Sequence, residues 1–302
     1  MDQPPVCDYE GSDYRTRFWE DQGRDYEDRV ERIALRRLLP ASGATLIDIG
    51  AGYGRLADEY DGYRRVVLFD YSRSLLREAQ ARLGADARFL YVAGNWYSMP
   101  FVAGLFDSLV QVRTIHHAAD VPALFAELAR IAAPEGAYVL EFASKHHLKA
   151  MLRYWLGRQS WSPFSLEPVE FVELNFDFHP RYIRQQLRAA GFRPGRRLTV
   201  SHFRLPLLKR LLPAGWLAAL DSLAQYSGRW WQLTPSVFQA SRAPAGSRPG
   251  GEAFFACPHC GAALGPPLAG ATGELVCPQT DCGHRWAVVD GLYDFKAPLG
   301  SQ

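Results

Sequence analysis

The sequence contains few cysteines, few methionines and almost no net charge. Five of its 302 residues are cysteine and three are methionine, and 34 Lys and Arg residues balance 32 Asp and Glu residues to a net charge of +2. A chain this close to neutral is not one that coats nucleic acid non-specifically. Its 48% hydrophobic and 22% charged residues are typical of a soluble globular protein, long enough for a large core and a small second module.

Long apolar runs are also absent. No stretch approaches the roughly 20 apolar residues that a membrane-spanning helix needs. The start, MDQPPVCDYE, is acidic and proline-rich, and it lacks the basic and then apolar pattern of a secretion signal. We therefore expect no transmembrane segment and a cytoplasmic location. In that compartment, clustered cysteines predict metal binding rather than disulfides.

Charge is distributed unevenly along the chain. No acidic residue lies between Asp177 and Asp221, although this region is rich in arginine and lysine. Such a region either decorates a solvent-exposed rim of helices and a strand, or faces an anion or RNA; the first is the commoner outcome. The basic residues are Arg181, Arg184, Arg188, Arg193, Arg196, Arg197, Arg204, Lys209 and Arg210.

Short β-rich runs alternate with helical stretches from residue 44 to about residue 144. ATLIDI, RRVVLFD, RFLYVA, FDSLVQV and AYVLEFA predict buried strands, and residues 56–60, 72–83 and 121–132 predict helices. Ser72 and Asp120 are suitable N-caps, with Pro122 in the first turn of its helix. This alternation predicts an α/β fold with a mostly parallel sheet covered on both faces.

The rest of the chain predicts two domains. The aromatic-rich region 145–234, interrupted by prolines, is expected to form an insertion and cap over the strand ends, including a helix over 180–190 and a strand near 198–205. PSVFQASR, at 235–242, predicts a closing strand, and APAGSRPGG, at 243–251, a linker. The first domain is therefore assigned to residues 1–242, with a helix or lid in 1–40, and the second to 252–302.

A glycine-rich turn, LIDIGAGYG, joins the first predicted strand to its helix. Free N–H groups and the lack of a side chain let a ligand approach such a turn closely. The spacing Gly50-x-Gly52-x-Gly54 is not the G-x-G-x-x-G of dinucleotide sites, and the P-loop pattern is absent. The next strand ends in Asp70, about twenty residues on, where a carboxylate can accept both ribose hydroxyls. NAD and S-adenosylmethionine binders share this feature.

The later strands favour one of these ligands. The third strand ends in AGNWYSMPF, where Asn95 and Trp96 can read an adenine ring and cover its face. LIDIGAGYG, LFDYS, AGNWYSMPF and FDSLVQVRTIHHAADVPALFAELARIAAPEGAYVLEF resemble, in that order, the motifs of class I S-adenosylmethionine-dependent methyltransferases. The resemblance covers residues of about 40–145, and 235–242 fits the closing strand of that fold. It implies a Rossmann-like methyltransferase sheet with helices on both faces.

The same resemblance implies roles for individual residues. The ribose would be held by Asp70, and Arg113 would face the methionine portion of the cofactor. Core packing is an equally good explanation for Tyr71. The remaining implied cofactor residues are Asp48 and Gly50 at the methionine amino group, Gly52 and Gly54 against the ligand backbone, Tyr71 on the adenine, and Asn95 and Trp96 at its edge.

The activated methyl needs alignment with an acceptor, and a base only when the acceptor must lose a proton. His116 and His117 follow the fourth strand, where the family places acceptor-side residues, so either is a candidate base; a structural role is the alternative. The Asn/Asp-Pro-Pro-Tyr/Phe element of enzymes that methylate adenine or glutamine is missing, and RTIH stands there instead. This favours a small molecule as the acceptor.

Two segments are candidates for covering the site. In similar enzymes the region before the first strand closes over the cofactor, which makes Tyr14, Trp19 and Tyr26 lid candidates; an amphipathic helix covering the sheet is the alternative. The aromatic insertion and LPLLKRLLPAGWLAALDSL either roof an apolar acceptor pocket or pack on the sheet.

The C-terminal fifty or so residues carry a C-x2-C and a C-x4-C pair separated by sixteen residues. Two such knuckles place Cys257, Cys260, Cys277 and Cys282 around one tetrahedral site, which predicts a structural Zn²⁺. Because the second knuckle is wide, His284 or His259 is an alternative ligand. The segment resembles the small zinc-ribbon proteins that partner methyltransferases, including the activator subunit of eukaryotic tRNA and translation-factor methyltransferases, which implies a β-rich zinc ribbon.

Three functions are consistent with these patterns. The first is a methyltransferase that transfers a methyl group from S-adenosylmethionine to a small or apolar acceptor. The second is a methyltransferase acting on RNA or a translation component, with the ribbon and the basic region as docking surfaces. The third is a non-catalytic adaptor that binds S-adenosylmethionine. The sequence predicts neither the acceptor nor the oligomeric state.

Overall fold

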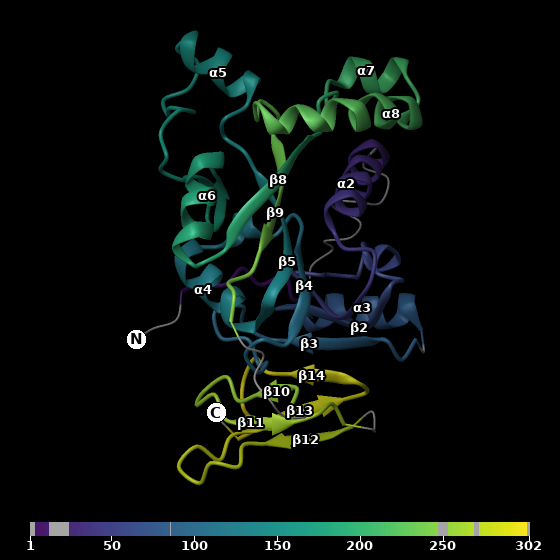
Figure 1. The fold of residues 1–302 in the computed structure, drawn as a ribbon, viewed down its shortest axis with the longest axis vertical. Coiled ribbons are helices and arrows are strands. Elements are labelled where there is room, and N and C mark those ends of the chain that lie inside the picture. Colours follow the sequence, from purple (N-terminus) through teal and green to yellow (C-terminus); the bar gives the residue numbers. More distant parts are fainter. Residues whose placement is uncertain (1–3, 12–23, 85, 247–252, 269–271, 301–302) are drawn as a thin grey trace.

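The computed structural model describes residues 4–11, 24–84, 86–246, 253–268 and 272–300. Its main feature is a single sheet of ten strands (Figure 1). These strands are β1 (Gly43–Ile49), β2 (Tyr63–Asp70), β3 (Phe89–Ala93), β4 (Phe106–Gln111), β5 (Ala132–Ala143), β8 (Arg193–Val200), β9 (Ser236–Arg242), β12 (Gly273–Val276), β13 (Arg285–Val289) and β14 (Leu292–Asp294). Two separate hairpin ladders pair β6 (Val169–Val172) with β7 (Asn175–Asp177), and β10 (Phe255–Ala256) with β11 (Ala263–Gly265).

The strand order across the sheet is β12-β13-β14-β3-β2-β1-β4-β5-β9-β8. The pairs β2–β3, β1–β2, β1–β4 and β4–β5 are parallel, as continuous apolar runs buried on both faces predict. β9 runs antiparallel between β5 and β8, which confirms the closing strand expected from PSVFQASR. The predicted α/β class is thereby confirmed.

Helices cover both faces of the sheet. α4 and α6 contribute to the hydrophobic core on one face, whereas α2, α3 and α8 contribute to the core on the other. The helices are α2 (Asp25–Leu38), α3 (Arg73–Leu83), α4 (Val121–Ile131), α5 (Leu148–Trp155), α6 (Pro180–Ala189), α7 (Pro206–Leu211) and α8 (Ala214–Ala224), with the short 3₁₀ turns η1 (Ala57–Glu59), η2 (Ile115–His117) and η3 (Gln225–Arg229).

Local capping explains where two of these helices begin. The Ser72 hydroxyl accepts a hydrogen bond from the Leu75 N–H at the start of α3, and the Asp120 carboxylate accepts one from the Ala123 N–H at the start of α4. Both predicted N-caps are confirmed. A helix was also expected over 56–60, but only η1 forms there, because the turn ends at Gly54 with φ of 73° and β2 already begins at residue 63.

The C-terminal strands extend the same sheet. β14 pairs in parallel with β3, with Leu292 opposite Tyr91 and Asp294 opposite Ala93. Phe255 also bridges to Phe101, and their rings stack with centroids 5.9 Å apart. β3 would otherwise be an exposed edge strand, and such edges invite unwanted pairing. The segment is therefore packed against the first domain, although the domain boundaries themselves remain a prediction.

The predicted linker enters the core at its beginning. Ala243 is fully buried, and its N–H donates to the Gly136 carbonyl at 2.8 Å. Residues 247–251 of that linker lie outside the described part of the chain. Within the described residues, the structure has no helix with both the length and the apolar character needed to span a membrane.

Candidate active site and metal centre

A cavity with an empty volume of about 860 Å³ opens at the carboxyl ends of β1, β2, β3 and β4. This is the edge at which open α/β sheets bind ligands. The cavity brings together most of the residues that the sequence pointed to as cofactor-binding. Of those, Asp48, Gly50, Gly52, Asp70, Tyr71, Trp96 and Arg113 line it, as does His117, whereas Gly54, Asn95 and His116 do not.

The glycine turn forms the floor of this cavity. Gly50 has a φ of 73°, and a Cβ at this position would lie 2.2 Å from Cγ2 of Thr114, so no side chain fits there. Gly52 also lies in the left-handed region, with φ of 53°, and only one side-chain atom comes within 4 Å of its Cβ position. Gly54 serves packing instead, because a Cβ on it would meet the side chains of Leu68 and Ala79 at 3.2 and 3.4 Å.

The Asp70 carboxylate is fixed by the main chain. Its Oδ2 accepts from the Gly52 N–H and its Oδ1 from the Ser72 N–H, both at 2.8 Å. Burial raises the pKa of Asp70, and these N–H groups act against that rise. Each oxygen keeps a further lone pair, so the carboxylate can accept two vicinal hydroxyl groups at the cavity wall.

A second carboxylate, Asp48, lies deeper in the cavity. Tyr60 donates its hydroxyl to Asp48 Oδ2 at 2.9 Å. Burial raises the pKa of Asp48 to about 7, and the nearby charge of Asp70 acts in the same direction. An ammonium group placed beside Asp48 would favour its ionised form.

Aromatic side chains occupy the opposite wall. Trp96 is buried, lines the cavity, and its indole N–H has no hydrogen-bond partner among the described residues. Tyr71 lies nearby with the Lys296 ammonium 4.0 Å from its ring centroid. Asn95 turns away, because its side-chain oxygen accepts from the Tyr97 N–H at 2.9 Å.

An ion-pair network that sequence reasoning missed lies where Arg55 and Arg113 line the cavity. Glu31 of α2 is fully buried and accepts from Arg113 Nε at 2.7 Å and from Arg55 at 2.9 Å. Both arginines line the cavity and lower the pKa of Glu31 against the effect of burial. Arg113 has a φ of 60°, and its N–H donates to Glu141 at 2.9 Å. Only Arg113 was predicted, because Glu31 belongs to a helix that showed no functional motif.

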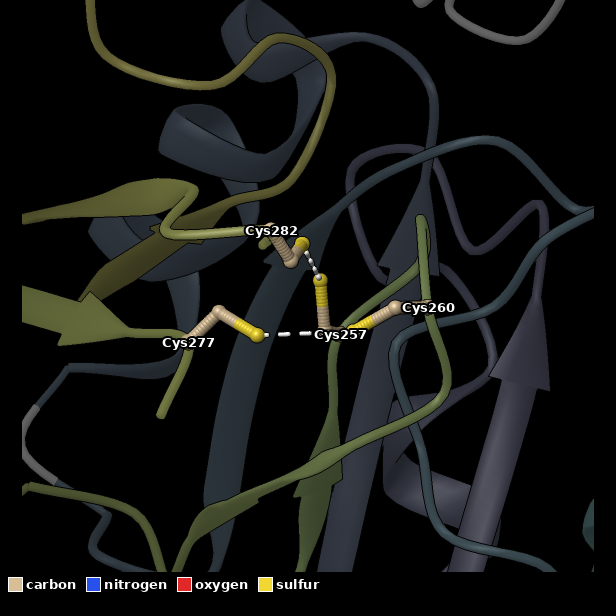
Figure 2. Close-up of side chains that lie close together, drawn as sticks. All are labelled: Cys257, Cys260, Cys277 and Cys282. Atoms are coloured by element: carbon tan, nitrogen blue, oxygen red, sulfur yellow. Dashed lines mark hydrogen bonds between the residues drawn. The ribbon is translucent and has the colours of Figure 1, made fainter. Parts of the chain in front are cut away.

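The four predicted cysteine ligands converge at the other end of the molecule (Figure 2). Their Sγ atoms all lie within 4.8 Å of one another, with Cys257 to Cys282 at 3.8 Å and Cys260 to Cys277 at 3.4 Å. These separations exceed the roughly 2.05 Å of a disulfide and suit four sulfurs around one ion. His284 Nδ1 lies 3.0 Å from Cys282 Sγ, outside the four-sulfur set, and the His259 ring lies against that of His284 at a tilt of 40°.

Comparison with protein families identifies the glycine-turn region. The model of the methyltransferase domain family matches residues 47–140, which span β1 through β5. Residues 47–140 form a methyltransferase domain. The predicted resemblance of this region to class I, S-adenosylmethionine-dependent methyltransferases is thereby confirmed. The C-terminal cysteine cluster resembles a zinc ribbon.

Two curated relatives of this methyltransferase domain are named for a sterol and for a quinone precursor. The rice (Oryza sativa subsp. japonica) 24-methylenesterol C-methyltransferase 2 is 30% identical over 125 residues, covering 39% of this chain and 34% of that protein. The demethylmenaquinone methyltransferase of Roseiflexus sp. is 28% identical over 184 residues, covering 56% of this chain and 76% of that protein. The chain thus spans about a third of the length of the sterol enzyme that it matches.

Solved structures share the fold at low identity. A complex between the Haloferax volcanii Trm112 methyltransferase activator and a methyltransferase matches with 20% identity and a TM-score of 0.51, covering 75% of this chain and 96% of that one. The [4+2]-cyclase SpnF matches with 18% identity and the same TM-score, covering 76% and 87%. One of these names is a cyclase, so the fold of a methyltransferase domain does not by itself fix the reaction.

The two histidines of the methyltransferase domain differ in their surroundings. His117 donates from Nδ1 to the Leu174 carbonyl at 2.7 Å, which leaves Nε2 to accept from the Tyr9 hydroxyl at 3.0 Å. Its neighbour His116 makes no hydrogen bond to a described residue, and burial lowers its pKa to about 3, with His117 and Arg113 contributing. Both imidazoles are therefore neutral near pH 7, but only His117 reaches the cavity.

A strap formed by residues 6–9 closes one side of the cavity. Val6, Cys7 and Tyr9 line the cavity, and the next residue, Glu10, accepts from the Arg73 and Ser74 N–H groups at the start of α3. Lys296 holds the strap from the C-terminal segment through an ion pair with Asp8 at 3.1 Å. The lid candidates Tyr14 and Trp19 lie outside the described residues. The third candidate, Tyr26, is buried and donates to Asp221, so it is a core residue.

Proposed function

We propose that this protein transfers the methyl group of S-adenosylmethionine to an apolar small-molecule acceptor. The observation that carries the proposal is the cavity of the methyltransferase domain, in which Asp70 can accept the hydroxyls of a ribose, Trp96 lines the wall, and Asp48 can meet an ammonium group. When bound, the cofactor supplies a sulfonium methyl that is already electrophilic. The chain therefore has to bind, orient and exclude water rather than create the electrophile.

The residues present fit that cofactor from end to end. Asp70 would hold the ribose diol, the turn at Gly50 and Gly52 would admit the ligand, and Tyr71 and Trp96 would contact the adenine. At the methionine end, Arg113 and Arg55 are already paired to Glu31, so an incoming carboxylate would share guanidinium donors with that side chain. The ion pairs with Glu31 therefore hold the guanidinium groups of Arg113 and Arg55 at the cavity wall before the cofactor binds.

Proton removal from the acceptor, where it is required, would fall to His117 rather than His116. His117 lines the cavity and presents an unprotonated Nε2, which Tyr9 covers through its hydroxyl. A base at this position would become available when the strap shifts and Tyr9 releases the nitrogen. His116 has a pKa of about 3 and lies off the cavity, which makes it a poor acceptor of a proton at neutral pH.

The apolar character of the acceptor is supported by two observations. The sterol and demethylmenaquinone methyltransferases that the chain resembles are named for apolar acceptors. The β6–β7 hairpin, whose Leu174 carbonyl accepts from the cavity residue His117, carries the exposed apolar side chains of Phe171 and Val172.

For the cysteine cluster, we propose one structural Zn²⁺ held by Cys257, Cys260, Cys277 and Cys282. Four thiolates are the ligand set of closed zinc sites, which leave no position for substrate. The ion would stabilise β10 to β14, a segment with a small core of its own, and through β14 the edge of the methyltransferase sheet.

Turnover with defined acceptors tests the proposed function. The purified protein is incubated with S-adenosylmethionine labelled in its methyl group, and with a sterol, an isoprenoid quinone precursor, a phenolic metabolite or tRNA as acceptor. We expect label in an extractable apolar product. Label in tRNA would favour the RNA-directed alternative, and cofactor binding without any labelled product would favour the adaptor.

Cofactor affinity should rise with pH across neutrality. Asp48 has a pKa of about 7 in the free protein, so it is largely protonated near pH 6, and ammonium binding requires its ionised form. The association constant for S-adenosylmethionine should therefore increase roughly fivefold to tenfold between about pH 6 and pH 7.5, below the usual α-amino pKa of about 8. Calorimetric titration at several pH values measures it. Asp48→Asn should bind more weakly and with no such slope, and a slope that persists in that variant would refute the assignment.

A further inference from the structure

Exposed large hydrophobic side chains gather on one part of the molecule, away from the cofactor cavity. Among the described residues, all but three of them lie between Leu148 and Trp231, and none of these lines the cavity. The three exceptions, Val276, Val289 and Leu299, belong to the C-terminal segment. Scattered exposed hydrophobic residues are normal, but concentration of this kind marks an interaction site.

Three helices contribute to this concentration with regular spacing. On α8, Trp216, Leu220 and Leu223 are exposed on one face, whereas Leu217 and Ala218 pack into the core. A helix that is apolar all round is normally covered on every side. On α7, Leu207 and Leu211 are exposed one turn apart, and no residue of that helix is buried.

α5 repeats the pattern. Leu148, Leu152 and Trp155 are 53%, 48% and 64% exposed at spacings of four and three, and the helix buries only Ala150 and Met151 on its other side. The 3₁₀ turn η3 follows α8 directly and leads to Trp230 and Trp231, which are 72% and 59% exposed.

These elements lie at one end of the molecule, opposite the C-terminal strands (Figure 1). The Leu148 N–H at the start of α5 donates to the Leu233 carbonyl at 3.0 Å, which connects α5 to the segment that follows η3. We call this end the apolar face. It comprises Leu148, Leu152, Trp155, Leu156, Leu207, Leu211, Trp216, Leu220, Leu223, Trp230 and Trp231.

Around α7, α8 and η3, between residues 178 and 242, the exposed charges have one sign. Asp221 is the only acidic residue between 178 and 242, and it is fully buried with hydrogen bonds to Tyr26 and His202. Every exposed charge in that region is therefore basic. Those on or next to α7, α8 and η3 are Arg204, Arg210 and Arg229. α5 adds the exposed Lys149 and Arg153, and the exposed Glu167, Glu170 and Glu173 lie in the segment that follows α5.

We propose that the apolar face binds the surface of an anionic lipid bilayer, with its Trp and Leu side chains in the boundary between headgroups and acyl chains. Apolar helix faces flanked by Lys and Arg bind such interfaces, and tryptophan is enriched at that depth. Four of the eight tryptophans of the chain belong to this face. This inference rests on the surface alone and does not depend on the proposed acceptor.

Two other occupants fit the face less well. Single-stranded RNA would use the basic and aromatic residues, but it offers nothing to the exposed leucines, which outnumber the tryptophans. A second copy of the chain would form a symmetric contact that sets the same patch against itself, and with it the same basic side chains. Anionic lipid satisfies both the apolar and the basic side chains.

Vesicle flotation tests the proposal with the full-length protein. Vesicles of phosphatidylcholine alone are compared with vesicles in which roughly a third of the lipid is phosphatidylglycerol, at low and high salt. We expect the protein to float with the anionic vesicles at low salt and to bind the neutral ones much less. The triple variant Trp216→Ser, Leu220→Ser, Leu223→Ser should lower the partition coefficient at least about tenfold, because it removes the inserted stripe of α8.

A matched control uses the opposite end of the molecule. Val276→Ser with Val289→Ser also removes exposed apolar side chains, at 54% and 46% exposure, and should leave flotation unchanged. Thermal unfolding of each variant verifies that the fold is intact.

Several results would each overturn the proposal. The folded wild-type protein could fail to float with the anionic vesicles at all, or the control variant could lose flotation as much as the α8 variant. Alternatively, the wild-type protein is a dimer by light scattering and does not float, and the α8 variant is a monomer. Binding of tRNA, together with failure to bind vesicles, would likewise assign the apolar face to RNA. The assay contains neither cofactor nor acceptor, so its failure leaves the proposed methyl transfer untouched.

Discussion

Replacing Asp70 with asparagine should weaken S-adenosylmethionine binding by at least about 100-fold while the protein remains folded. Both carboxylate oxygens accept main-chain N–H groups at 2.8 Å, from Gly52 and Ser72. An amide has only one oxygen, so either orientation points an NH₂ group at one of these donors. That conflict is present with and without ligand, so the loss of affinity comes from the ribose, whose two hydroxyls exchange an ionised acceptor for a neutral amide at roughly 1–3 kcal/mol each, and about 2.7 kcal/mol corresponds to 100-fold.

Calorimetry with the Asp70→Asn variant measures this loss directly. Asp61→Asn is the matched control, since its carboxylate is 83% exposed and stands outside the cavity. Removing the buried charge of Asp70 also removes its desolvation cost, so the unfolding temperature should change little. Undiminished affinity in Asp70→Asn would mean that the second strand does not hold the ribose.

Replacing Cys257 with serine should release the metal and lower the unfolding temperature by more than about 10 °C. Binding of structural zinc contributes on the order of 10 kcal/mol in small zinc domains, which rivals the total stability of a typical domain. Cys257 is buried beside Phe255, whose ring packs on Phe101 of the methyltransferase domain. Loss of the cluster should therefore also loosen the β14–β3 pairing at the sheet edge.

Metal analysis measures the loss of zinc, calorimetric scanning measures the unfolding temperature, and limited proteolysis detects the loosened β14–β3 pairing. Cys7→Ser is the control for thiol loss, because Cys7 lies on the strap and should leave the zinc content unchanged. Cleavage in Cys257→Ser should begin within 253–300. Wild-type protein purified without chelator that contains no zinc would contradict the assignment of the cluster.

Local sequence patterns predicted the features that depend on neighbouring residues. The helix caps Ser72 and Asp120 need only a side chain and an N–H three residues on, and the turn at Gly50 needs only the absence of a Cβ. The cysteine cluster was predictable for the same reason, since each knuckle is a local turn. The parallel sheet was predicted from short continuous apolar runs, which indicate strands buried on both faces.

Features that join distant parts of the chain were not predictable in this way. Glu31 and Arg113 are 82 residues apart, Tyr9 and His117 are 108 apart, and Lys296 reaches Asp8 across 288 residues. No spacing rule connects such pairs, because tertiary packing alone brings them together. For the same reason the C-terminal segment was expected behind a linker, and its pairing with β3 could not be foreseen.

The parallel pairing of β14 with β3 has a consequence for how the protein behaves in dilute solution. β3 has β2 on one side and β14 on the other, so no open strand edge remains there for a separately made protein to join. The occupant of that edge is tethered to the same polypeptide, and its local concentration does not depend on how much protein is present. Dilution, which dissociates a two-subunit enzyme, leaves this sheet whole.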